Sequence, residues 1–146
     1  MKLNFQRINE AARLPEYAHP TDSGMDVFAF LSKSVVIRPC ESMRIPLGIR
    51  AEIPHGYELQ VRPRSSMSSN GLEVAFGTVD EGYRGEISVT VHNLTAHPAI
   101  IKNGLKVAQM VLAPVTRAVI VGVAEIGTDT DRGANGFGST GTGVSK

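Results

Sequence analysis

Glycine and proline interrupt this chain at short intervals, and their spacing limits the elements that it can form. The 146 residues include 15 glycines and 8 prolines, which leaves few stretches long enough for a helix. Only INEAARLPEY (residues 8–17) hints at one, and Pro15 cuts it short. Between the interruptions lie short runs rich in valine and isoleucine, which are typical of strands. These runs span residues 26–30, 34–39, 43–53, 57–63, 71–76, 86–94, 99–104, 106–115 and 118–126.

Two of these runs have the period of a strand with one buried face. In YELQV (57–61) and EISVTV (86–91), every second residue is apolar. About ten such strands, separated by turns, predict a single all-β domain, built as a jelly-roll or β-clip barrel. The glycine-rich C-terminal tail is expected to be flexible, because ordering a glycine costs the most backbone entropy.

The run at residues 118–126 breaks the alternation, since seven of its nine residues are apolar. A strand that is apolar on both faces needs cover on both sides, and a small domain offers few such places. The run is therefore either a central strand of the domain or a strand that packs against another subunit, and an oligomer is expected. We place the β domain at residues 1–126 and the tail at residues 127–146.

Composition excludes several classes of protein. Hydrophobic residues make up 42% and charged residues 20%, as in an ordinary globular protein. The net charge of +1, with acids and bases interspersed, predicts no nucleic-acid partner. No apolar run is long enough for a membrane span, and the N-terminal sequence lacks the features of a signal peptide. The single cysteine, Cys40, fits a reducing compartment, so a soluble cytoplasmic protein is expected.

Two loop-like stretches place charged side chains among glycines and serines. TDSGMDVFAF (21–30) puts Asp26 at the start of a strand, which a turn capped by aspartates would also explain. RPRSSMSSNG (62–71) sets Arg62 and Arg64 beside four serines. Guanidinium groups, hydroxyls and free backbone N–H groups suit phosphate oxygens, and the alternative is a solvated loop.

A third stretch, GTVDEGYRGE (77–86), places Asp80 three residues before Tyr83. It is either a tight turn with Glu81 and Gly82 at its tip or the carrier of a general base. A catalytic aspartate here would have to be ionised and held near a reacting water.

The tail RGANGFGSTG (132–141) has the glycine spacing of a phosphate-cradling loop. It lacks the lysine and the following helix of that loop, which excludes a P-loop NTPase. Its glycines, with Arg132, Ser139 and Thr140, could still wrap an anionic ligand. The four histidines have no zinc-binding spacing, and no serine-hydrolase elbow is present in the sequence.

Taken in order, these stretches resemble the five motifs of the trimeric dUTP diphosphatases (dUTPases). The motifs follow one another from residue 14 to residue 141, over nearly the whole chain, which makes the resemblance specific. The matching segments are LPEYAHPTDSGMDVFA, PRSSMSSNGL, GTVDEGYRGEI, NGLKVAQMVL and RGANGFGSTG.

The resemblance implies a jelly-roll homotrimer with three active sites at subunit interfaces. Such an enzyme requires Mg²⁺ and hydrolyses dUTP to dUMP and pyrophosphate, which keeps uracil out of DNA and supplies dUMP. Asp80 would orient and deprotonate the water that attacks the α-phosphorus. Asp26 would affect the metal indirectly, through water, while the triphosphate itself holds most of the Mg²⁺ coordination.

The resemblance also assigns substrate contacts. Tyr83 would lie against the deoxyribose and exclude a 2′-hydroxyl, and Phe137 would stack on the uracil. A hairpin around EVAFGTV (73–79) would read the uracil through backbone groups of Gly77, Thr78 and Val79. Phosphate contacts would come from Arg64, Ser65, Ser66, Gln109 and Arg132, with Gly138, Ser139 and Thr140 closing over the site.

Two other functions are weighed against this one. The dCTP deaminases of the same superfamily use a glutamate ten residues after the turn aspartate as a proton shuttle. This chain has Thr90 there, which cannot transfer protons in that way. The second alternative is a regulatory protein that keeps the nucleotide pocket to control binding to a partner, against which the intact Asp80 argues.

Overall fold

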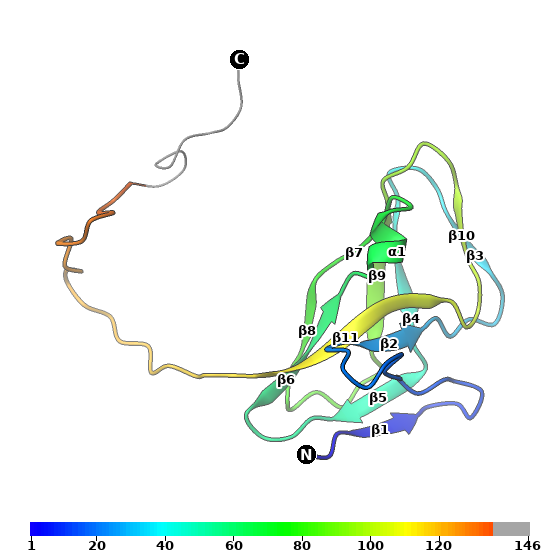
Figure 1. The fold of residues 1–146 in the computed structure, drawn as a ribbon, viewed down its shortest axis with the longest axis horizontal. Helices are drawn as coiled ribbons and strands as arrows, with labels where there is room; N and C mark the ends of the chain where they lie inside the picture. The colour runs from blue at the N-terminus through cyan, green and yellow to red at the C-terminus, as the bar shows by residue number, and fades with distance from the viewer. Residues whose placement is uncertain (136–146) are drawn as a thin grey trace. The chain divides into compact units, whose positions relative to one another are not determined.

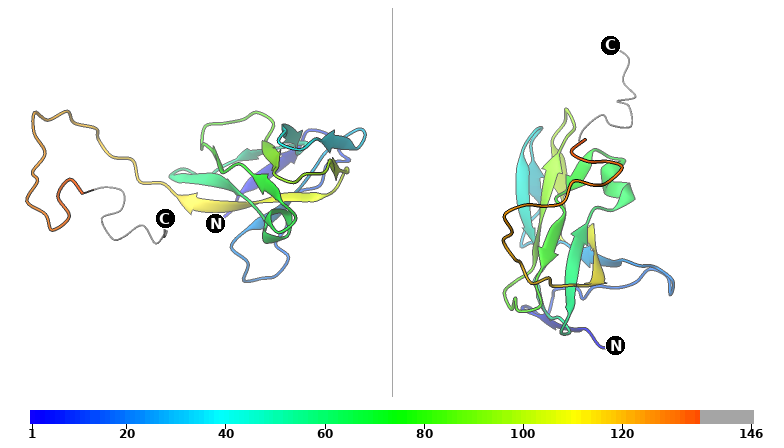
Figure 2. Two further views of the ribbon diagram at one scale, coloured as in Figure 1. Left: turned by 90° about the horizontal axis from the view of Figure 1, so that it is seen from above. Right: turned by 90° about the vertical axis from the view of Figure 1, so that its left-hand side faces the viewer.

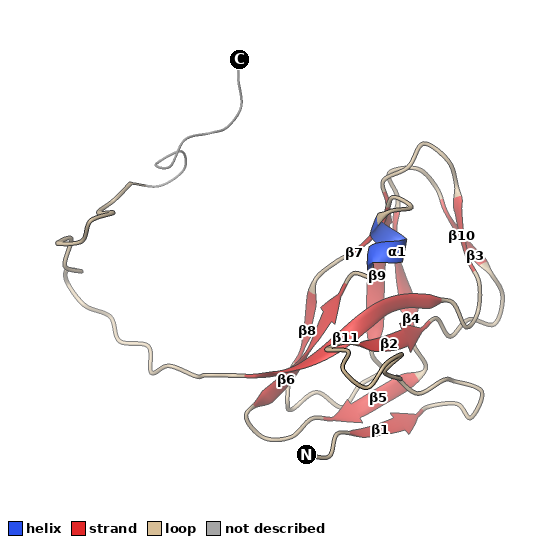
Figure 3. Ribbon diagram, viewed as in Figure 1, coloured by secondary structure: helices blue, strands red, loops and turns tan. Residues whose placement is uncertain are grey.

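Short antiparallel strands make up most of the structure, as the valine- and isoleucine-rich runs predict (Figures 1 and 3). The computed structural model describes residues 1–135. That part of the chain contains eleven strands and one short helix. In order they are β1 (Asn4–Arg7), β2 (Met25–Phe28), β3 (Val35–Ile37), β4 (Ser42–Pro46), β5 (Ile49–Glu52), β6 (Tyr57–Arg62), α1 (Ser65–Ser68), β7 (Leu72–Val74), β8 (Gly77–Val79), β9 (Ser88–Asn93), β10 (Ala99–Ile101) and β11 (Lys106–Pro114).

Two larger sheets organise the domain. One has the strand order β2-β11-β6-β8 and the other β4-β9-β7, while β1 pairs with β5 and β10 with β3. All the pairings are antiparallel. The long yellow strand β11 runs beside β6 in every view (Figures 1 and 2). The all-β fold expected from the sequence is therefore confirmed.

The core is a single cluster of apolar side chains drawn from both larger sheets. Leu59 and Val61 of β6, and Val89 and Val91 of β9, are all buried, so the period-2 pattern is confirmed in both strands. Asn93 is fully buried among them, and it is satisfied by hydrogen bonds that include its Nδ2 donating to two backbone carbonyls. Burial of this apolar surface is the main stabilising contribution in a domain of this kind.

Three local expectations differ from the structure. The run at 43–53 is two strands, because Gly48 (φ +66°) turns the chain and a Cβ there would lie 2.7 Å from the Phe30 ring. Residues 8–17 form no helix; Asn9 instead closes a turn by accepting a hydrogen bond from Ala12 N–H at 2.9 Å. The serine-rich loop contains the helix α1, whose Met67 is buried against the core.

Of the two interpretations of residues 118–126, a central strand of the domain is wrong. The chain divides into two units at Thr116, and from Arg117 to residue 135 it forms no helix or strand. Val119 and Ile120 are 89% and 96% exposed. A strand needs a neighbour for its backbone groups, whereas the backbone hydrogen bonds recorded between residues 117 and 135 are local to residues 128–135. Within residues 1–135, no helix is long and apolar enough to cross a membrane.

Candidate active site

Asp26 is the buried polar centre of the first predicted site. It lies in β2, which is buried along its whole length, and the residue is only 8% exposed. Its partner across the sheet is Gln109 in β11, and β6 lies on the far side of that strand. The pairing of β2 with β11 thus brings the first and fourth motifs together.

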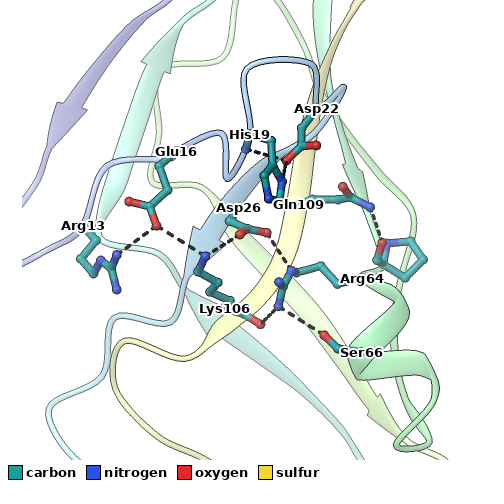
Figure 4. Close-up of polar contacts among 10 residues, drawn as sticks. Arg13, Glu16, His19, Asp22, Asp26, Arg64, Ser66, Lys106 and Gln109 are labelled. Carbon is teal, nitrogen blue, oxygen red and sulfur yellow. Dashed lines mark hydrogen bonds and ion pairs between the residues drawn. The ribbon is translucent and has the colours of Figure 1, made fainter.

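Two cations hold the Asp26 carboxylate (Figure 4). Arg64 Nε lies 2.7 Å from Oδ1, and Lys106 Nζ lies 2.7 Å from Oδ2. Arg64 Nη1 also donates to the Lys106 carbonyl at 3.1 Å and to Ser66 Oγ at 3.4 Å. Because its guanidinium group is bound on several sides, Arg64 is fixed in place before any ligand arrives.

The network continues outward from Lys106. Its ammonium lies 3.5 Å from Glu16 Oε1, which also pairs with Arg13 at 3.2 Å (Figure 4). The hydrogen bond with Asp26 raises the pKa of Lys106, with smaller contributions from the charges of Asp26 and Glu16 and an opposing one from desolvation. Lys106 therefore stays a cation beside Asp26.

Gln109 is positioned by a close approach to glycine. Its Nε2 donates to the Pro63 carbonyl at 2.8 Å, just before Arg64. A Cβ on Gly24 would lie 2.9 Å from the Gln109 Cδ and would clash with its Oε1. Glycine at position 24 is therefore required for this orientation of the amide.

These side chains line one pocket of about 280 Å³. The predicted phosphate contacts Arg64, Ser65, Ser66 and Gln109 all face it, together with Asp26. His19 and Asp22 complete the rim, with His19 Nδ1 at 3.1 Å from Asp22 Oδ2. The structure thus brings together an arginine, two hydroxyls and an amide, which are suitable donors for phosphate oxygens.

Asp80 lies elsewhere, in the turn that follows β8. Tyr83 N–H donates to the Asp80 carbonyl at 3.0 Å, so the tight turn expected from the sequence is present. Asp80 itself is exposed, and its carboxylate has no hydrogen bond or ion pair with any residue from 1 to 135. It is free to bind a water.

Tyr83 folds back over its own turn. Its hydroxyl donates to the Glu86 carbonyl at 2.9 Å. A Cβ on Gly85 would lie 2.6 Å from the Tyr83 Cζ and would clash with the hydroxyl oxygen. Glycine at position 85 therefore allows the tyrosine ring to lie close to the backbone.

A second pocket, of about 180 Å³, surrounds these residues. Thr78, Val79, Asp80 and Tyr83 line it, as do Glu86, Ile87 and Ser88, which the sequence did not single out. The predicted hairpin at 73–79 is wrong: β7 pairs with β9, and β8 pairs with β6. Ala75 N–H donates to Thr90 O at 2.9 Å, which keeps the first half of the segment on the other sheet.

The two pockets lie far apart in one chain. Asp26 is in β2 and Asp80 follows β8, the two edge strands of the four-stranded sheet. Three strand spacings separate these edges by about 14 Å, and the pairing rows of Asp26 and Val79, the residue before Asp80, are offset by about 10 Å along β6. On a flat sheet the Cα atoms of Asp26 and Val79 would therefore be about 17 Å apart, and the two pockets share no lining residue.

The remaining predicted residues belong to the second unit or lie beyond the described part of the chain. Arg132 Nε donates to the Asn135 carbonyl at 3.2 Å. Phe137, Gly138, Ser139 and Thr140 lie outside residues 1–135. Lys106 and Glu81 were missed by sequence reasoning, although both occur within the quoted motifs.

The donor set does not form a metal cage. Residues 1–135 contain no group of three histidine, cysteine or acidic side chains close enough to hold an ion. Both Asp26 oxygens already contact cations. A magnesium ion would therefore need most of its ligands from the substrate and from water.

Comparisons with known proteins agree with the motif order. The dUTPase family model matches residues 10–141. The deoxyuridine 5′-triphosphate nucleotidohydrolase of Clostridium kluyveri is 46% identical over 97% of this chain and 99% of its own length. That of Gloeothece citriformis is 44% identical over 97% of both chains.

Solved structures show the same fold. A mutant of the Staphylococcus bacteriophage 80alpha dUTPase with dUpNHpp is 27% identical, with a TM-score of 0.83 over 96% of this chain and 98% of its own. A mutant dUTPase from phage phi11 of S. aureus, which coordinates a structural Mg(II) ion, is 27% identical, with a TM-score of 0.80 over 86% of this chain and 99% of its own. With a family model that spans nearly all of its length, the chain belongs to the dUTPase family.

Proposed function

We propose that this protein hydrolyses dUTP to dUMP and pyrophosphate. The observation that carries the proposal is Arg64, fixed by Asp26 and the Lys106 carbonyl in a pocket of phosphate-binding groups. The relatives described above are named for this reaction, and one solved neighbour contains dUpNHpp. Phosphoryl transfer depends mainly on positioning and charge stabilisation, and a pre-oriented arginine supplies both.

Asp80 is the proposed general base. It would accept a proton from the water that attacks the α-phosphorus, and its carboxylate is exposed for that contact. Tyr83, beside it, would pack against the deoxyribose. β8 is an edge strand, so the backbone of Gly77, Thr78 and Val79 has one edge without a strand partner among residues 1–135 to contact uracil.

The active site would combine two subunits of a homotrimer. A base must lie within about 3 Å of the oxygen atom whose proton it removes, yet the strand position before Asp80 is about 17 Å from that of Asp26 in one chain. The phosphate pocket of one subunit would therefore face the Asp80 turn of another. The exposed apolar residues of 118–126 support a further subunit contact there, since such a segment marks an interaction site.

Magnesium would enter with the triphosphate, whose charge it neutralises, and would meet Asp26 only through water. The protein's own part would be to bind the phosphates through Arg64, Ser65, Ser66 and Gln109. The chain would function as a β domain (residues 1–126) and a tail (residues 127–146). The last motif, which lies in the tail, would close over the nucleotide. Phe137 would cover the base and Arg132, Gly138 and Ser139 the phosphates, so cutting the chain after Thr130 should leave an oligomer with little activity.

The substrate assignment is tested with purified protein, Mg²⁺ and four nucleotides: dUTP, dCTP, dTTP and UTP. Pyrophosphate release is expected from dUTP well above the other three. Absence of release from dUTP would contradict the proposal, and ammonia release from dCTP would indicate a deaminase instead.

The free, exposed Cys40 is consistent with a reducing compartment, and we place the enzyme in the cytoplasm.

A further inference from the structure

A carboxylate that has no part in the proposed reaction attaches the Asp80 turn to a neighbouring loop. Glu81 Oε2 accepts a hydrogen bond from Gly56 N–H at 2.9 Å, and its Oε1 lies 2.8 Å from His55 Nδ1. Both partners belong to the connection between β5 and β6. The Glu81 side chain is 24% exposed and that of His55 is 89% exposed, so the bond to Gly56 is the better shielded of the two.

Gly56, the loop residue that donates to Glu81, is itself fixed by its backbone contacts. Gly56 has a φ of +79°, which favours glycine, and its carbonyl accepts a hydrogen bond from Val115 N–H at 2.8 Å. One peptide segment thus links the Asp80 turn to the end of β11. A carboxylate bound to a backbone N–H forms a charge-assisted bond, stronger than a neutral one.

Arg84 holds the turn from within. Its Nη1 donates to the Glu81 carbonyl at 2.6 Å and to the Tyr83 carbonyl at 2.9 Å. The Asp80 carboxylate, in contrast, has no bond of its own to residues 1–135. Its position therefore depends on the backbone of the turn and on whatever fixes that backbone.

We propose that Glu81 is a positioning residue for Asp80, acting through its bond to Gly56 N–H. The inference rests on the proposed dUTP hydrolysis, in which Asp80 is the base. Small displacements of a base from the reacting water are costly, because proton transfer requires hydrogen-bond distance.

The primary variant is Glu81→Ala, which removes the bond to the loop. We expect kcat for dUTP to fall by about tenfold, and the Kd of a non-hydrolysable dUTP analogue to change by a smaller factor. Hydrogen exchange at Gly56 N–H should become faster. Activity is measured well below the Tm of each variant, so that loss of stability does not imitate loss of positioning.

Glu81→Gln separates positioning from charge. Its carboxamide oxygen can still accept from Gly56 N–H, so we expect it to keep most of the wild-type kcat and the slow exchange at Gly56. Glu41→Ala is the matched control. Glu41 Oε2 likewise accepts a backbone hydrogen bond, from Arg38 N–H at 3.0 Å, but it lines neither pocket.

The inference is overturned if Glu81→Ala retains the wild-type kcat, if Glu81→Gln is as slow as Glu81→Ala, or if Glu41→Ala is equally slow. Failure of the proposed function has a different signature. The wild-type protein would then release no pyrophosphate from dUTP, while exchange at Gly56 would still report whether Glu81 holds the loop.

Discussion

Asp26 and Asp80 occupy opposite edges of one sheet, and their surroundings are opposite in kind. Asp26 is 8% exposed and holds a cation on each oxygen at 2.7 Å. Asp80 is exposed, and its carboxylate has no bond to residues 1–135. A carboxylate between two cations orients them, whereas an open carboxylate can take a water and a proton. We therefore expect one edge of the sheet to bind phosphate and the other to carry out proton transfer.

The largest expected effect comes from removing the open carboxylate. Asp80→Asn should lower kcat for dUTP by about 10²–10⁴, the usual contribution of a general base. Nucleotide binding and Tm should change little, because the side chain is exposed and unbonded. Pyrophosphate release and calorimetric titration with a non-hydrolysable analogue check this. A variant with near-normal rate would show that Asp80 is not the base.

A substitution in the phosphate pocket, at the arginine that holds Asp26, should affect both nucleotide binding and protein stability. Arg64→Lys keeps the charge but cannot reproduce contacts to Asp26, the Lys106 carbonyl and Ser66 together. We expect kcat/KM to fall by about 10–100-fold and Tm to decrease, because hydrogen bonds to charged groups contribute about 1.5–3 kcal/mol. An unchanged Tm would mean that Asp26 is adequately held by Lys106 alone.

Two glycines provide a matched pair of smaller changes. Gly85→Ala should displace Tyr83, lower kcat/KM for dUTP by about tenfold and reduce the preference for dUTP over UTP. Gly24→Ala should displace Gln109 and weaken phosphate binding without changing that preference. Rates with both nucleotides are measured for each variant. Equal loss of sugar discrimination in the two would contradict the separation of the pockets.

The smallest expected effect is on stability at high pH. The pKa of Lys106 is raised by its hydrogen bond with Asp26, so the folded state binds this proton more tightly than the unfolded chain. Its contribution is complete below the ordinary lysine pKa of about 10.4 and is lost as the pH rises through the higher folded value. Lys106→Met should therefore show a smaller loss of Tm than wild type as the pH rises above about 10.4. Parallel Tm curves would contradict this.

Local pattern was sufficient for much of the fold but not for all of it. The alternation around Val89 marks a strand because that period depends only on adjacent residues. The run at 118–126 is apolar enough for a strand, yet its side chains are exposed. An apolar composition specifies neither a partner strand nor the location of that partner. The break at Gly48 depends on contact with Phe30, which is distant in sequence.

The candidate site was also only partly predictable from the sequence. The order of the motifs identifies Asp26, Arg64 and Asp80, but it does not state which of them share a pocket. Contact between Asp26 and Lys106 joins residues 80 positions apart, through a register that contains an irregularity between Lys106 and Ala108. Only the pairing of β2 with β11 reveals that contact.

In the proposed homotrimer, one active site combines the phosphate pocket of one subunit with the Asp80 turn of another. Subunits carrying Asp80→Asn and subunits carrying Arg64→Ala are unfolded, mixed in equal amounts and refolded together. If the site lies between subunits, the mixed oligomers should regain activity at about one quarter of their sites, although each variant alone is nearly inactive. If the mixture is no more active than the sum of the two separate variants, the site lies within one chain, which contradicts a site shared by two subunits.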